Sequence, residues 1–127
     1  MQLDVRDQVP HFDIIDVDGR RVAYGDLWQR RHLLLILLPD DPDGDVDYRA
    51  ALAAHMTELA AHETAVVITR NAVAGAPRPG VVVADRWGEI QWVAAAGGAA
   101  ELPPPPAIVE WLRYVQMQCP ECQGETR

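Results

Sequence analysis

The chain has no lysine, and its eleven basic residues are all arginines. This excludes Schiff-base chemistry and lysine nucleophiles. Positive charge is also scarce, because 19 acidic residues against 11 basic ones give a formal net charge of −8. An acidic surface repels nucleic-acid backbones and anionic membranes, so we expect neither as a partner.

Long apolar runs are missing as well. The longest, residues 33–38, is far too short to cross a bilayer. The N-terminus lacks the apolar region of a secretory signal, so we predict a cytoplasmic protein. With 127 residues, of which 49% are hydrophobic and 24% charged, the chain has the composition of one folded domain. We expect this domain to span residues 1–118, followed by a tail at 119–127.

Hydrophobic periodicity predicts an α/β domain. An N-terminal β-hairpin is expected around the turn at Asp18 and Gly19. Further strands are expected at residues 33–38, 65–69, 81–84 and 89–94, with a helix at 46–61 and a final helix that ends near Gln118. A helix between the first two of these strands indicates a parallel pair, and the later strands form an antiparallel pair. Together they predict a central mixed sheet flanked by helices.

Several segments resemble a known family. DQVPHFDIIDVDGRRVAYGDL resembles the opening of redoxin domains in the peroxiredoxin branch, the alkyl hydroperoxide reductase and thiol-specific antioxidant type. LLLILLP resembles the central strand of these domains, and VVVADRWGEIQWV resembles their later hairpin. The resemblance implies a thioredoxin-like fold, antioxidant or thiol–disulfide oxidoreductase activity, a peroxide or disulfide substrate and no cofactor.

The resemblance also implies where the reactive cysteine of active members lies: just after the central strand, at the start of the next helix. Residues 39–46 read PDDPDGDV and contain no cysteine, serine or threonine, so the standard mechanism cannot operate there. We interpret the acidic residues as a solvated loop in which Asp43 or Asp45 caps the helix. The alternative is a calcium loop, although the downstream glutamate that such a loop needs is absent. The acidic residues are Asp40, Asp41, Asp43, Asp45 and Asp47.

One proline matches a further feature of thioredoxin-fold proteins. These proteins commonly have a cis-proline ahead of the strand that follows the second helix, packed against the reactive cysteines. Pro79, just before the expected strand at 81–84, fits this position. We therefore predict a structural role for Pro79. The resemblance implies a cis Arg78–Pro79 peptide bond, and the alternative is an ordinary trans loop proline, since X-Pro bonds are usually trans.

The only two cysteines, Cys119 and Cys122, both lie in the tail. Their Cys-Pro-Glu-Cys motif resembles glutaredoxin-like dithiols, and it also resembles the tails of a subset of bacterial redoxin-like proteins. As a dithiol, Cys119 and Cys122 would be the catalytic residues, one attacking the peroxide or disulfide and the other resolving the intermediate. This is the first functional hypothesis.

The runner-up is a catalytically degenerate redoxin that binds or scaffolds another protein. In that case Cys119 and Cys122 would be structural or would bind zinc, which requires four ligands. The missing ligands would have to come from a histidine or from a second chain across a homodimer axis. The histidines are His11, His32, His55 and His62. A third interpretation gives the cysteines no special role, with Cys119 packed as a small apolar residue and Cys122 as a surface thiol.

Overall fold

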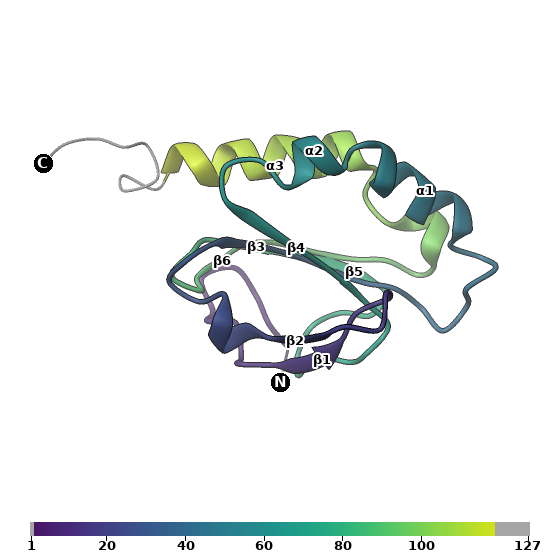
Figure 1. The fold of residues 1–127 in the computed structure, drawn as a ribbon, viewed down its shortest axis with the longest axis horizontal. Coiled ribbons are helices and arrows are strands. Elements are labelled where there is room, and N and C mark those ends of the chain that lie inside the picture. The colour runs from purple at the N-terminus through teal and green to yellow at the C-terminus, as the bar shows by residue number, and fades with distance from the viewer. Residues whose placement is uncertain (1, 119–127) are drawn as a thin grey trace, which may run out of the picture.

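The computed structural model describes residues 2–118 as an α/β fold (Figure 1). The strands are β1 (Asp13–Ile15), β2 (Arg21–Ala23), β3 (His32–Leu37), β4 (Thr64–Thr69), β5 (Gly80–Ala84) and β6 (Ile90–Ala95). The helices are α1 (Val46–Ala54), α2 (Met56–Leu59) and α3 (Pro105–Gln118), with short 3-10 turns η1 (Tyr24–Asp26) and η2 (Ala99–Glu101).

The main sheet has the strand order β4-β3-β5-β6. β3 runs parallel to β4 and antiparallel to β5, and β5 pairs antiparallel with β6. The predicted mixed sheet is therefore confirmed. The predicted N-terminal hairpin is confirmed too, because β1 and β2 pair antiparallel around a turn in which Gly19 has a φ of +84°. Figure 1 shows the hairpin on one face of the main sheet and the three helices on the other.

The apolar run of β3 lies at the centre of the fold because both faces of the sheet are covered. Alternate side chains of a strand point to opposite faces. Leu33, Leu35 and Leu37 pack into a core with the hairpin side, whereas Leu34 and Ile36 pack into a second core beneath the helices. Every residue of β3 is buried. A continuous apolar strand of this kind is expected where helices and a hairpin enclose a sheet.

The helix predicted at 46–61 is divided into two. α1 ends at Ala54, and His55 has a φ of −109° and a ψ of 14°, outside the helical range. The His55 imidazole Nδ1 lies 2.9 Å from the Ala51 carbonyl oxygen, so the side chain contacts the last turn of α1. α2 then begins at Met56 and places Leu59 in the core on the helix side of the sheet. The prediction of one helix was wrong at this break.

α3 begins inside the proline run and crosses the sheet. Its first residue, Pro105, suits the first turn of a helix, where a missing N–H costs nothing. The segment before it is held to α1 by the Tyr48 hydroxyl, which donates a 2.7 Å hydrogen bond to the Pro103 carbonyl oxygen. Burial raises the pKa of Tyr48 to about 12.

Among residues 2–118, no helix is long and apolar enough to cross a membrane.

Replacing Tyr48 by phenylalanine is expected to lower the free energy of unfolding by about 1 kcal/mol, because the part-buried Pro103 carbonyl loses its donor. Urea denaturation measures the change. Tyr114→Phe is the matched control, since Tyr114 is exposed on α3, and it is expected to leave the midpoint within about 0.5 kcal/mol of the parent. Equal midpoints for Tyr48→Phe and the parent would show that the hydrogen bond contributes nothing.

Candidate functional site

The loop after the central strand is built by three strand ends that meet at one edge of the sheet. β3 leads directly into residues 38–45 and then into α1. The carboxyl ends of parallel strands lie at the same edge, so Arg70, just after β4, is brought to the loop. β5 is antiparallel to β3 and starts at this edge, which brings Arg78 there as well. Figure 1 shows the loop beyond the start of α1.

Asp45 is the centre of this loop. Its side chain is completely buried, and its carboxylate accepts hydrogen bonds from Arg70 at 2.6 and 3.1 Å and from Arg49 Nε at 2.7 Å. Arg70, followed by Arg49, holds the pKa of the Asp45 carboxyl below its usual range despite burial. Asp45 is the N-cap residue of α1, yet its side chain makes no capping hydrogen bond. The prediction of a solvated, capping carboxylate was therefore wrong for Asp45.

A second arginine fixes the outer part of the loop. Arg78 donates to both carboxylate oxygens of Asp40, at 3.1 and 3.2 Å, and to the Leu38 carbonyl oxygen at 3.2 Å. Arg70 likewise donates to the Pro39 carbonyl oxygen at 2.7 Å. Hydrogen bonding to Arg78 lowers the pKa of Asp40, which is itself exposed. The two arginines thus hold both the backbone and the carboxylates of the loop.

The remaining aspartates of the loop behave as the sequence predicts. Asp41, Asp43 and Asp47 are exposed. The Asp41 carboxylate accepts a 3.1 Å hydrogen bond from the Gly44 backbone N–H, which keeps it within its own turn. Across residues 2–118, no three histidine, cysteine or acidic side chains are grouped so as to hold a metal ion. The ion-paired loop therefore gives the calcium alternative no support.

Pro79 adjoins this loop through Arg78. The Arg78–Pro79 peptide bond is cis, as the resemblance implies, and not trans. The Pro79 carbonyl oxygen accepts a 3.1 Å hydrogen bond from the Ala96 N–H, so the residue also closes the end of the β5–β6 pair. The predicted packing of this proline against reactive cysteines concerns Cys119 and Cys122, which lie outside the described residues.

α3 runs away from the acidic loop. It begins near α1 and passes back over the sheet, so its C-terminal end lies at the opposite end of the molecule from the start of α1 (Figure 1). The 14 residues of α3 span about 20 Å.

The arginines of the loop were missed from the sequence. Asp45 is separated from Arg70 by 25 residues, and Asp40 from Arg78 by 38 residues, so no local pattern pairs them. The sequence does contain one indirect signal for these pairs, which is the predicted order and direction of the strands. Arg70 directly follows a strand predicted to be parallel to the central one, which places it at the same sheet edge as the acidic loop.

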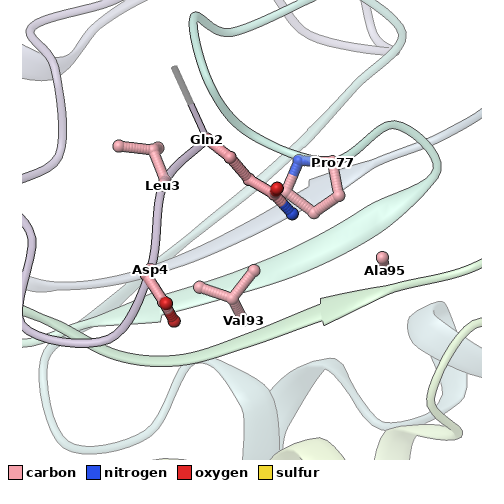
Figure 2. A pocket seen from close by; sticks show the side chains of 6 residues that line it. All are labelled: Gln2, Leu3, Asp4, Pro77, Val93 and Ala95. Carbon is pink, nitrogen blue, oxygen red and sulfur yellow. The ribbon is translucent and has the colours of Figure 1, made fainter.

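A separate pocket lies beside the edge strand β6 (Figure 2). Its volume is about 390 Å³. Its lining residues come from the N-terminal segment, the loop before β5 and β6; they are Gln2, Leu3, Asp4, Pro77, Val93 and Ala95. Among the described residues, this lining offers one carboxylate and one amide beside four apolar side chains, and it contains no thiol, hydroxyl or imidazole.

Solved structures with a similar arrangement of elements include peroxiredoxins. The mitochondrial 2-Cys peroxiredoxin from Plasmodium falciparum has a TM-score of 0.68 at 7% identity, over 96% of this chain and 98% of that chain. The chain has a thioredoxin-like fold. A peroxiredoxin-like protein from Aquifex aeolicus has a TM-score of 0.62 at 11% identity, over 91% of this chain and 89% of that chain. Thiol peroxidase from Chromobacterium violaceum has a TM-score of 0.55 at 14% identity, over 94% of this chain and 91% of that chain.

No protein-family model and no curated protein sequence matches the chain. The structural likeness at these low identities concerns the thioredoxin-like fold alone. The loop after β3, at residues 39–46, contains the ion-paired carboxylate of Asp45. A carboxylate cannot form the sulfenic acid on which thiol-peroxidase chemistry depends.

Proposed function

We propose that the protein is a redoxin-like thiol–disulfide oxidoreductase with antioxidant character, whose chemistry is carried by Cys119 and Cys122. The observation that carries this proposal concerns the loop at residues 39–46. Two ion pairs, Arg70 with Asp45 and Arg78 with Asp40, hold this loop in place. Redox chemistry in this chain requires sulfur that can be oxidised and reduced. Its only two thiols stand in one Cys-x-x-Cys motif directly after α3.

The reaction follows ordinary dithiol chemistry. The thiolate of one cysteine attacks an oxygen of a hydroperoxide, forming an S–O bond and breaking the O–O bond, and the alkoxide leaves as an alcohol after taking up a proton. The second thiolate then attacks the oxidised sulfur, forms the disulfide and releases water. An external dithiol reduces the disulfide and is itself oxidised. With a disulfide as substrate, the same two attacks exchange one disulfide for another.

The dithiol is tested by alkylation and intact mass. Reduced full-length protein is expected to alkylate at both cysteines, whereas protein treated briefly with one equivalent of hydrogen peroxide is expected to resist alkylation until a reductant is added. Cys119→Ser and Cys122→Ser are each expected to abolish peroxide-dependent disulfide formation within the chain. Two freely alkylating thiols after peroxide treatment, or a Cys122→Ser variant that consumes peroxide as fast as the parent, would overturn the proposal.

A second candidate is favoured by one specific observation. The ion pairs of Asp45 turn the usual reaction site into a structural element, which is what a redoxin retained as a protein-binding or scaffolding domain requires. In this candidate Cys119 and Cys122 share a zinc ion with other ligands, across a homodimer where a second chain supplies them. Zinc content of the purified full chain, measured together with its oligomeric state, separates the candidates. Thiols that alkylate only after a chelator is added support zinc.

A further inference from the structure

β6 is an edge strand of the main sheet, and part of its outer edge is unpaired. The sheet ends at β6, because the strand order is β4-β3-β5-β6. The N-terminal segment covers the first residue of β6. The Arg6 N–H donates to the Ile90 carbonyl oxygen at 2.8 Å, and the Ile90 N–H donates to the Asp7 carbonyl oxygen at 2.9 Å. Beyond Ile90, residues 2–118 make no further backbone hydrogen bond along this edge, so it is open to another strand.

The register of β5 and β6 identifies the residues whose backbone groups point outward. The Ala96 N–H donates to the Pro79 carbonyl oxygen at 3.1 Å, so the facing residues Gly80 and Ala95 form a non-hydrogen-bonded pair. The two kinds of pair alternate along an antiparallel ladder, and Val93 is therefore of the same kind as Ala95. The N–H and C=O groups of Val93 and Ala95 thus point away from β5, toward the open edge.

The pocket beside β6 lies against this open edge (Figure 2). Val93 and Ala95 both line the pocket, with Gln2 and Asp4 from the N-terminal segment. Val93 also packs against the core on the hairpin side of the sheet. In an added strand, the residues opposite Val93 and Ala95 would have their side chains on this same face. The pocket, at about 390 Å³, has room for such side chains beside the Asp4 carboxylate.

The helix side of the same edge carries aromatic side chains. Trp92 of β6 stacks on Trp111 of α3, with ring centroids 5.2 Å apart and ring planes at 10°. Trp111 also contacts Tyr114 edge-on at 5.4 Å, and 47% of Tyr114 is exposed. A hollow of about 200 Å³ is lined by Trp111, Tyr114 and Glu110. The other alternate side chains of an added strand would therefore meet an aromatic surface with a carboxylate beside it.

Charge determines which kind of strand fits this edge. Both faces offer a carboxylate, from Asp4 in the pocket and from Glu110 in the hollow. Arg113 approaches Glu110 only to 3.7 Å, in an exposed pair that contributes little. A second copy of the chain would bring like carboxylates and a second net charge of −8 to the edge, which opposes pairing. A basic segment is attracted instead, and its cations can lie on the aromatic rings.

We propose that the open edge of β6 binds an extended, positively charged segment of a partner protein, which adds to the main sheet as a further strand. Its backbone bonds to Val93 and Ala95. Its alternate side chains enter the pocket beside Asp4 or lie against Trp111 and Tyr114. The site uses no thiol, so the inference is independent of the redox chemistry proposed for the tail. It gives the protein-binding candidate a defined surface and a defined kind of partner.

The probe for this site is an acetylated and amidated five-residue peptide that alternates arginine and valine. It is added to the full-length protein at low salt, and binding is measured by calorimetry. Amide hydrogen exchange, followed by NMR, locates the site. We expect the amide protons of Val93 and Ala95 to become protected, while that of Asp47 on α1 is unchanged. A peptide with glutamate in place of arginine is expected not to bind.

Methylation of the peptide backbone provides a second measurement that needs no variant protein. Only alternate N–H groups of an added strand face the neighbouring strand. Methylating the nitrogens of the valines and methylating those of the arginines are therefore expected to have opposite results, one abolishing binding and the other preserving it. Equal effects of the two sets of methyl groups would overturn strand addition. No peroxide or reductant is used, so failure here leaves the proposed redox function untouched.

Variants of the protein test the edge directly. Ala95→Pro removes the outward N–H and is compatible with an edge strand, so it is expected to weaken peptide binding about tenfold. Ala95→Ser keeps the N–H and is the matched control. Asp4→Asn is expected to weaken binding about threefold at low salt and less at high salt. An arginine peptide that does not bind, or that binds Ala95→Pro or Asp4→Asn as tightly as the parent, overturns the inference. So does a dimer of the protein alone in which the Val93 and Ala95 amides are already protected, because a second copy would then occupy the edge.

Discussion

Asp45→Asn is expected to lower the free energy of unfolding by about 3 kcal/mol. The substitution removes the negative charge that two arginines surround, while the side chain stays in a completely buried position. An asparagine amide also turns an N–H group toward guanidinium donors. Arg70 and Arg49 are part-exposed, with 25% and 36% of their side chains accessible, so water recovers some of the loss. Urea denaturation of the parent and the variant measures the difference.

The control for Asp45→Asn is Asp43→Asn, in the same loop. Asp43 is exposed, so its replacement is expected to change stability by less than about 0.5 kcal/mol. The pH dependence provides a further check. Arg70 lowers the pKa of Asp45 in the folded state, so the unfolded state binds more protons in the window below the ordinary value of 3.8. The stabilisation is present above that value and is lost as the pH falls through the folded-state pKa.

The Asp45→Asn variant is expected to lack this acid-dependent component, since asparagine does not titrate. A variant that unfolds at the same urea concentration as the parent, with the same loss of stability in acid, would contradict the assignment of Asp45 as the electrostatic centre of the loop. If Asp43→Asn lost as much stability as Asp45→Asn, the effect would come from the general acidity of the segment and not from the ion pairs of Asp45.

Gly80→Ala is the second substitution with a large expected effect, about 2–3 kcal/mol of lost stability. Gly80 opens β5, between Leu37 of β3 and Ala95 of β6. A Cβ atom there would lie 2.7 Å from the Pro77 carbonyl oxygen and 2.8 Å from that of Ala94. Both neighbours are backbone atoms, so the strands themselves would have to move apart.

Gly98→Ala is the matched control for Gly80→Ala. A Cβ at Gly98 meets no atom within 4 Å, and the backbone there is extended, with a φ of −173°. We expect its free energy of unfolding to stay within about 0.5 kcal/mol of the parent. Thermal and urea unfolding of both variants measure the effect. A Gly80→Ala protein as stable as the Gly98→Ala protein would show that the β5 start tolerates a side chain.

The sequence was sufficient for the fold because its strongest signals are local. The apolar run at 33–38 predicted the central strand, and the Asp18-Gly19 turn predicted the hairpin. The order of strands and helices then predicted the mixed sheet. The break at His55 was not predictable, because alanine-rich segments favour a continuous helix and no local pattern marks the change of backbone angles at His55.

The candidate sites were less accessible to sequence reasoning. The acidic composition of residues 39–46 suggested a solvated loop. No local sequence pattern shows that Arg70 forms an ion pair with Asp45. His32 was considered only as one histidine among four, although it is buried at the start of β3. Long-range pairing of this kind follows from topology, which a single sequence reports only indirectly. Cys119 and Cys122 remain assigned from their motif.

The buried carboxylate at the start of α1 gives this end of the fold a permanent charge. A thiolate in the same place would change its charge and size whenever an oxidant reached it, and the surrounding helix turn would have to adjust. Asp45 undergoes no such change, and its two arginine partners keep it ionised. α1 and the loop before it should therefore have the same structure in oxidising and reducing surroundings. Oxidants that would alter a cysteine leave this ion-paired carboxylate unchanged.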